Sequence, residues 1–232
     1  AFSENWQEFV LGNPSRYPLA EYPQMNRNYL ALELTFQKVY SDPFNFFISY
    51  VLSRNYGNYQ GLFDSENGSF AGNFTTTFDY LEMVEKSTGL LPYDRTHSIK
   101  FNGSYRFDFG LSIGATFSWI SGTPLNEYGV GTENHSRIFL KPRGTAGRTP
   151  SIWDINLRLA YDLPSFSLIN YNARLIVDVF HIASRKEPVT YDQIHYLGVD
   201  ENGTQILPNP TYGQPTRYFP PMSLRIGMEV NF

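Results

Sequence analysis

The sequence predicts an all-β fold in which about seven meandering antiparallel strands form a segment of a transmembrane β-barrel. Three observations support this prediction: seven segments alternate between apolar and polar residues, short and long connections alternate between them, and aromatic residues gather at both ends of the segments. Successive side chains of a strand point to opposite faces, so each segment has one apolar and one polar face. At ~3.3 Å per residue and ~45° tilt, segments of about eleven residues span roughly 25 Å, which is the height of a barrel's apolar band.

Composition narrows the possible classes. The 232 residues carry a net charge of -4, so nothing indicates nucleic-acid binding. Aromatic residues make up 17% and charged residues also 17%, below the roughly 25% of ordinary soluble domains. The absence of cysteine excludes disulfides and thiolate metal sites. No apolar run approaches the ~18 residues of a spanning helix, so a membrane location would require a closed barrel.

The first three predicted strands cover residues 29–40, 44–56 and 97–107. Their apolar residues recur at every second position: Leu30, Leu32, Leu34 and Phe36 in the first strand, Phe46, Ile48, Tyr50 and Leu52 in the second, and Ile99, Phe101 and Tyr105 in the third. Polar residues fill the positions between them.

The other four predicted strands cover residues 111–121, 152–162, 171–181 and 222–232. Their polar faces, with that of strand 97–107, carry full charges in mid-strand: Lys100, Asp154, Arg158, Arg174, Asp178, Arg225 and Glu229. We expect charges such as Arg158, Asp154, Arg174 and Asp178 to form cross-strand ladders. A soluble β-sandwich that turns its polar faces to water would show the same alternation, so alternation alone leaves both architectures open.

The connections favour the barrel. Tight turns near residues 42–43, 108–110 and 164 alternate with long polar loops at 57–96, 122–150 and 183–217. Outer-membrane barrels combine short periplasmic turns with long external loops in this way. The aromatic residues form two groups, with Tyr40, Phe44, Phe107, Phe109, Tyr161, Tyr171 and Phe232 at the short-turn end and Tyr29, Tyr56, Trp119, Trp153 and Phe219 at the long-loop end. We interpret them as two aromatic girdles.

The strand number predicts a fragment. Seven strands that end in the periplasm place residue 29 outside the cell, whereas bacterial single-chain barrels have an even number of strands. We therefore expect residues 1–28 to be an extracellular loop or the end of a preceding strand, and residues 29–232 to be the C-terminal part of a larger barrel. An eighth strand near Trp6–Leu11 is the alternative, although that stretch alternates poorly.

Short motifs at the strand–loop junctions carry a family resemblance. They are, in order, Tyr29-Leu-Ala-Leu-Glu-Leu34, Ser49-Tyr50, Ser53-Arg54, Gly57-Asn-Tyr-Gln-Gly-Leu62, Leu91-Pro-Tyr-Asp-Arg-Thr-His97, Gly103-Ser-Tyr105, Ser121-Gly-Thr-Pro124, Pro142-Arg-Gly-Thr-Ala-Gly-Arg-Thr-Pro150 and Tyr218-Phe-Pro-Pro221. Together they make residues 26–232 resemble the C-terminal barrel region of TonB-dependent outer-membrane receptors of the Oar-like group. The family's plug, TonB-contacting box and signal sequence have no counterpart in these residues.

The resemblance implies a transporter of the outer membrane of a Gram-negative-type bacterium, not an enzyme, that takes up a bulky, scarce ligand actively and needs no cofactor. Its implied partners are outer-membrane lipid, the missing N-terminal strands and plug of the same protein, TonB through that plug, and the barrel-assembly machinery. Two alternatives stay open: a complete small outer-membrane barrel that acts as an enzyme or adhesin, and a soluble β-sandwich binding module.

The last strand, 222–232, looks like an outer-membrane assembly signal. Such a signal has a polar residue, a glycine, an apolar residue and a terminal aromatic, and Arg225, Gly227, Val230 and Phe232 match it. The same residues could simply close the barrel, and both roles are compatible.

Other candidate sites have simpler interpretations. Asp178 and His181 are three apart in the predicted strand and so should face opposite sides, which argues against a catalytic pair. Asp192 and His195 could bind a metal, but a solvated loop is the simpler interpretation, as it is for His135. We interpret segments 64–68 and 200–203 as turns rather than calcium loops. We interpret the acidic loop 57–96 as a solvated external loop rather than a contact for a cationic ligand. Segment 143–148 could either hold an anion in a backbone nest or fix the loop to the rim of the barrel.

Overall fold

The computed structural model describes residues 22–41, 43–61, 63–64, 69–70, 78–133, 135–164, 172–183 and 186–231. Seven long strands dominate it, each within a few residues of its predicted segment: β1 (Arg27–Ser41), β2 (Phe44–Gly57), β6 (His97–Arg106), β7 (Leu111–Ile120), β10 (Ile152–Asp162), β11 (Asn172–Phe180) and β16 (Ser223–Asn231). The predicted all-β fold with a seven-strand meander is therefore confirmed.

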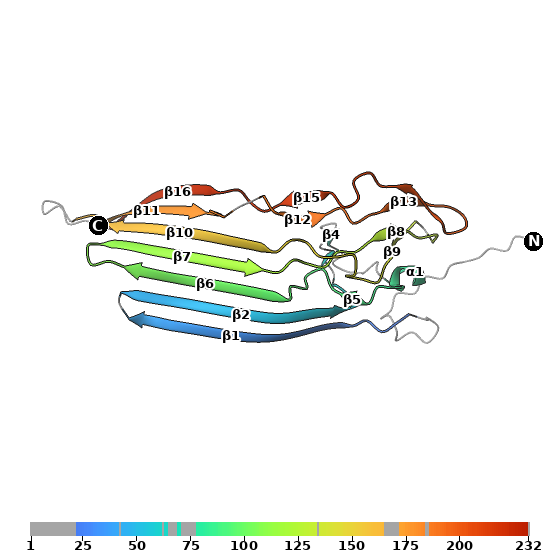
Figure 1. Cartoon of the computed structure of the whole chain (residues 1–232), viewed down its shortest axis with the longest axis horizontal. Coiled ribbons are helices and arrows are strands. Elements are labelled where there is room, and N and C mark those ends of the chain that lie inside the picture. The colour runs from blue at the N-terminus through green and yellow to red at the C-terminus, as the bar shows by residue number, and fades with distance from the viewer. Residues whose placement is uncertain are drawn as a thin grey trace, which may run out of the picture.

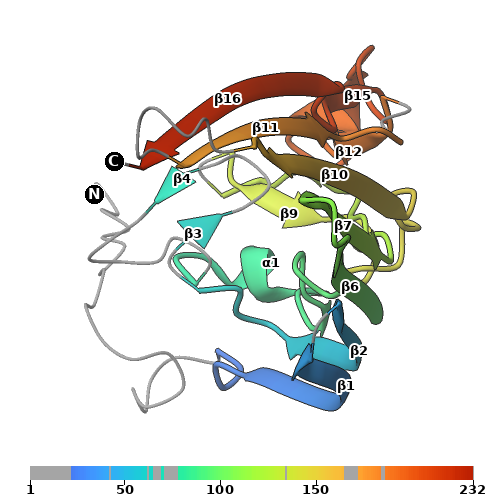
Figure 2. The same ribbon diagram turned by 90° about the vertical axis from the view of Figure 1, so that its left-hand side faces the viewer.

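All seven long strands belong to one antiparallel sheet in the order β1-β2-β6-β7-β10-β11-β16. The sheet curves strongly, with β1 and β16 at its two ends (Figure 2). Within the described residues these two strands do not pair with each other, so the sheet is an open part of a barrel wall.

The long connections all lie at one end of the sheet, opposite the short turns (Figure 1). They contain short elements that the sequence did not reveal: β3 (Phe63–Asp64), β4 (Ser69–Phe70), α1 (Leu81–Val84), β5 (Gly89–Leu90), β8 (Tyr128–Val130), β9 (Arg137–Phe139), β12 (Pro188–Tyr191), β13 (Tyr196–Val199), β14 (Gln205–Pro208) and β15 (Pro215–Tyr218). Four pairs of these strands form small separate sheets, and β5 pairs antiparallel with the end of β2. The loops thus satisfy backbone groups among themselves.

In the main sheet, large apolar side chains are exposed on one face and several polar side chains are buried on the other, which is the reverse of the usual pattern in a soluble protein. On the apolar face Leu34 is 57% exposed and Ile226 is 66% exposed. On the polar face Ser49, Asp154 and Asp178 are buried, with exposed fractions of 6%, 8% and 3%. Polar side chains are usually exposed in soluble proteins, and large exposed apolar surfaces mark contacts with a partner or a membrane. The sheltered polar face fits the concave side of a barrel wall, and the exposed apolar face fits its lipid-facing side.

Aromatic residues lie at both ends of the apolar face. Along one row across the sheet Tyr50 pairs with Ile99, Ile99 with Trp119 and Trp119 with Trp153, near the long-loop end. At the short-turn end the rings of Tyr105, Phe107 and Phe109 contact one another in succession, the first pair edge to face and the second tilted, with ring centroids 4.6 and 5.3 Å apart. Tyr29 differs from the predicted girdle, because it pairs with Asn55 and shares the polar face.

Most fully buried apolar side chains lie in the loop region rather than in the sheet, among them Phe78, Val84, Leu91, Tyr128 and Phe139. The described residues include no helix with the length and apolar character needed to cross a membrane.

Candidate functional site

A ladder of ion pairs crosses the polar face of the sheet. Asp178 of β11 accepts hydrogen bonds from Arg158 of β10 at 2.6 and 3.2 Å and from Arg225 of β16 at 2.6 and 2.9 Å. The three residues are direct cross-strand neighbours, because Asp178 pairs with Arg158 on one side and with Arg225 on the other. The predicted cross-strand pairing is confirmed here, and it ties the last three long strands together through one carboxylate.

A second carboxylate extends the ladder toward the short turns. Asp162 of β10 accepts from Arg174 of β11 at 2.5 Å and from Arg106 of β6 at 3.3 Å. These side chains are more exposed than the Asp178 carboxylate, with 31% for Asp162 and 4% for Asp178. The deeper cluster is therefore the stronger link.

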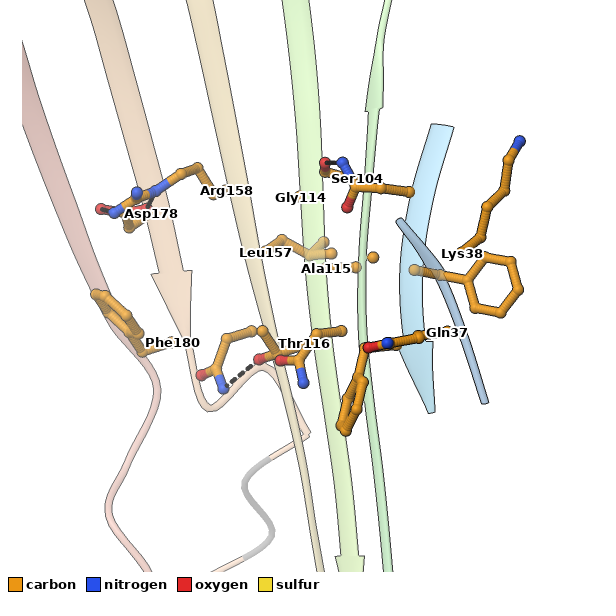
Figure 3. Close-up of a pocket in the computed structure, with 16 residues that line it drawn as sticks. Gln37, Lys38, Ser104, Gly114, Ala115, Thr116, Leu157, Arg158, Asp178 and Phe180 are labelled. Atoms are coloured by element: carbon orange, nitrogen blue, oxygen red, sulfur yellow. Dashed lines mark hydrogen bonds and ion pairs between the residues drawn. The ribbon is translucent and has the colours of Figure 1, made fainter. Parts of the chain in front are cut away.

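A hollow of about 540 Å³ lies over the middle of the sheet, next to the Asp178 cluster. Its lining combines amide and hydroxyl side chains with three phenylalanines, and includes Asn45, Phe47, Asn102, Thr116, Asn156 and Phe180. Figure 3 shows Arg158 and Asp178 at one side of the lining. The side-chain amide of Asn156 donates a hydrogen bond to the Thr116 hydroxyl at 3.1 Å. Such a surface can bind a partner by hydrogen bonds and stacking. The described residues hold no group of three or more His, Asp or Glu side chains arranged for a metal ion.

His181 lies just outside the strand in which the sequence placed it, so the argument from strand alternation was wrong for this residue. The predicted strand ran through residue 181, but β11 ends at Phe180 and His181 has a positive φ of 56°. Strand alternation therefore does not apply to it. Its backbone N–H donates to Asn156 Oδ1 at 2.9 Å, and its Nδ1 lies 3.1 Å from Asp154 Oδ1. The residue thus fixes the end of β11 to β10, and its imidazole faces Asp154 rather than Asp178.

The suggested pair Asp192 and His195 does not converge on a common point. The Asp192 carboxylate accepts hydrogen bonds from the side chains of Asn209 and Thr211 and from the backbone N–H of Ile194. His195 instead lies between the rings of Tyr196 and Tyr212, each 4.2 Å away, and its Nδ1 is 2.7 Å from Glu127 Oε1. The two side chains therefore serve different loop contacts.

Glu127 is the centre of one of these contacts. Lys141 Nζ lies 2.6 Å from its second oxygen, opposite His195. Burial raises the pKa of the Glu127 carboxyl, but hydrogen bonds from Lys141 and His195 outweigh it and hold the pKa below its usual value. The hydrogen bond to Glu127 also raises the pKa of Lys141.

Asp94 and Arg148 fix the base of the loops to the sheet. Asp94 is 1% exposed; its Oδ1 accepts from the backbone N–H of Asn55 at 2.7 Å and its Oδ2 from Arg148 at 2.5 Å. Arg148 also donates to the Gly122 carbonyl at 2.7 Å. These contacts favour rim fixation over an anion nest for segment 143–148. Arg143 stacks over Phe139 at 4.6 Å.

Two further loop candidates have structural roles. Asp200 accepts from the backbone N–H groups of Asn202 and Thr204, which is the geometry of a turn. In the acidic loop, Glu82 accepts from Thr132, Glu133 and Ser136, so this carboxylate joins two loops instead of facing solvent alone. Residues 65–68 of the other turn lie outside the described residues.

Arg225, Gly227 and Val230, three of the four residues of the predicted assembly signal, lie in the edge strand β16. Arg225 binds Asp178, Gly227 pairs with Ile176, and Val230 pairs with Ala173 and is 40% exposed. A side chain added at Gly227 would meet nothing within 4 Å. Phe232 lies outside the described residues.

No local sequence pattern marks Asp94 or Glu82 as residues that organise the loops, because their partners are far away along the chain. Asp94 and Arg148 are separated by 54 positions, as are Lys86 and the carbonyl of Leu140 to which it donates. A cluster of such contacts is visible only once the strands have brought the loop bases together.

Comparison with known proteins identifies a relative. The chain is 35% identical over 196 residues to a protein named TonB-dependent transporter Oar from Myxococcus xanthus. The match covers 82% of this chain and 18% of the relative, so the chain spans about a fifth of the length of the curated relative. No protein-family model matches the chain. No solved structure matches it either.

Proposed function

The chain is a barrel region of the TonB-dependent receptor type, and from this premise we propose that it forms the C-terminal part of the wall of an outer-membrane transporter. The observation that carries the proposal is the burial pattern of the sheet, in which apolar side chains are exposed on one face and the carboxylates of Asp154 and Asp178 are buried on the other. A wall between lipid and a plugged lumen needs this arrangement. Barrels of this class have 22 strands, so seven strands are roughly the last third.

The rest of the transporter supplies what the seven strands lack. Edge strands β1 and β16 would pair with further strands, since unpaired backbone groups are costly in lipid. The ladder around Asp178 and the hollow beside it would face a plug domain. TonB would act through that plug to drive active uptake of a bulky ligand, whose identity depends on loops and plug together. A complete small barrel would instead need β1 to pair with β16.

The last strand has a second proposed role in biogenesis. Arg225, Gly227, Val230 and Phe232 would be read by the barrel-assembly machinery before β16 closes the wall against the first strand of the protein. The open space beside Gly227 is compatible with a close approach of another chain to this edge.

Cysteine labelling of the full-length protein in cells tests the membrane arrangement. This chain contains no cysteine, so single substitutions within it add one reactive thiol each. A membrane-impermeant maleimide should label Glu201→Cys in the turn after β13 on intact cells. It should label Asp108→Cys in a short turn only after the outer membrane is permeabilised. Equal labelling of both positions on intact cells would refute the arrangement.

Binding of the periplasmic domain of TonB tests energy coupling. The full-length protein in detergent should retain this domain in a pull-down, and removal of its N-terminal region should abolish retention while the barrel stays folded. Failure of the intact protein to retain the domain would refute a TonB-driven mechanism without affecting the barrel assignment.

A further inference from the structure

Among the described residues, a cation near the long-loop end of the apolar face has no carboxylate partner. Arg54 of β2 is exposed and pairs across the strands with Leu30. Its guanidinium lies 4.8 Å from the centre of the Tyr56 ring. Within the part of the chain that the structure describes, Arg54 forms no ion pair. A charge on the lipid-facing side therefore keeps its hydrogen-bond donors available.

An apolar groove of about 650 Å³ lies beside this cation. Leu30, Leu32, Leu52 and Leu90 supply its apolar lining, and Arg54 and Arg148 supply its cations. Asp94, which also lines the groove, already pairs with Arg148. The remaining charge of the groove is thus the single positive charge of Arg54.

The height of Arg54 matches that of lipid head groups. It lies four residues beyond Tyr50, whose row contains Trp119 and Trp153, on the side of the long loops. Four residues at ~3.3 Å each and a tilt of ~40° raise Arg54 about 10 Å above this aromatic row. Aromatic rings mark the boundary of the hydrocarbon layer, so the guanidinium reaches the level of phosphates while the leucines continue the apolar surface toward it.

We propose that Arg54 and the adjoining leucine groove bind a phosphorylated, acylated glycolipid of the outer leaflet, with its phosphate on Arg54 and an acyl chain along Leu30, Leu32 and Leu52. The inference rests on the proposed orientation of the chain, in which the long loops face outward. Charge complementarity and continuity with the exposed apolar face specify this occupant. Guanidinium groups bind phosphate through paired, charge-assisted hydrogen bonds.

Lys38 provides a matched control at the other end of the same hairpin. It is exposed, pairs with Phe46, and lies 5.5 Å over the ring of Phe44. Lys38 thus repeats the combination of a cation on an aromatic ring, but at the short-turn end, where it would face the inner leaflet.

Native mass spectrometry of the purified full-length protein in detergent tests the proposal, with bisphosphorylated lipid A or phosphatidylglycerol as probes. Arg54→Gln should weaken lipid A retention about tenfold, the loss of one charge-assisted contact, and Lys38→Gln should not change it. Removal of both lipid A phosphates should have the same effect on the wild-type protein as Arg54→Gln.

Three results would overturn the inference. They are unchanged lipid A retention by Arg54→Gln, equal Arg54-dependent retention of phosphatidylglycerol, and loss of a protein dimer rather than of lipid in the variant. Heat-modifiable gel migration verifies that each variant is folded, and cysteine labelling reports orientation independently of lipid. A folded, correctly oriented protein that ignores lipid A therefore contradicts this inference alone and leaves the proposed function intact.

Discussion

The ion pair between Asp94 and Arg148 should determine how firmly the long loops are held to the rim of the sheet. The informative change is Asp94→Asn, which keeps the shape of the side chain and an oxygen that can still accept from the Asn55 N–H. It removes the charge that faces Arg148 and places an amide N–H group against the donors of the guanidinium. The substitution thus tests the ion pair rather than the packing.

The expected cost follows from the burial of the two partners. Leaving one member of a fully buried pair without its partner costs about 3–5 kcal/mol. The Asp94 side chain is 1% exposed but that of Arg148 is 33% exposed, so water can solvate part of the abandoned charge. We therefore expect a loss of about 2 kcal/mol, which corresponds to about a 30-fold rise in the opening equilibrium of the loop base.

Limited trypsin cleavage after Arg95, in the full-length protein in detergent, measures this opening. The cleavage rate follows the open population when opening and closing are faster than cleavage. The matched control is Glu201→Gln, which removes one negative charge in the exposed turn after β13 and should leave cleavage at Arg95 unchanged. A wild-type rate in Asp94→Asn, or an equal acceleration in both variants, would refute the reasoning.

Three further predictions concern the ladder, the loops and the last strand. Asp178→Asn should lower the temperature at which folded gel mobility is lost more than Asp162→Asn does, because the Asp178 carboxylate is 4% exposed and that of Asp162 is 31% exposed; equal shifts would contradict the ranking. The pKa of Glu127 is held below its usual value, so its contribution to stability is complete above about pH 4.3 and is lost as the pH falls through the lower folded pKa. Hydrogen exchange around Lys141 should therefore accelerate below about pH 4, and Glu127→Gln should remove this dependence; a profile unchanged by the substitution would count against it. Deletion of Phe232 should lower the amount of assembled protein in the outer membrane several-fold at equal synthesis, measured by heat-modifiable migration, and an unchanged amount would argue against an assembly signal.

The sheet was predictable because its information is local. Each long strand alternates with a period of two, and the short turns fix which residues face each other across a hairpin. The charges at Arg158, Asp178 and Arg225 lie on one face by alternation, and the register places them side by side. Their pairing therefore follows from alternation together with the register of neighbouring strands.

The loop contacts were not predictable for the opposite reason. Glu82 and Ser136 are 54 positions apart and carry no shared periodicity. The alternation argument likewise failed for His181, because the backbone leaves the strand after Phe180 and adopts a positive φ. Arg54 shows a related limit, since its place on the apolar face follows from alternation but the groove beside it includes Leu90 from a distant loop.

The exposure of the apolar face also indicates which surfaces of this segment need neighbours. The leucines of β1 are between 56% and 78% exposed, and Leu224, Ile226 and Met228 of β16 are between 62% and 67% exposed. Leu157 and Leu159 of the inner strand β10 are only 37% and 42% exposed, because strands flank them on both sides. The higher exposed fraction of the side chains on β1 and β16 reflects the one neighbouring strand that each edge lacks. Lipid can solvate these side chains but cannot hydrogen-bond the unpaired backbone beside them, so it is the backbone of β1 and β16, more than their apolar side chains, that requires the remaining strands of the proposed barrel.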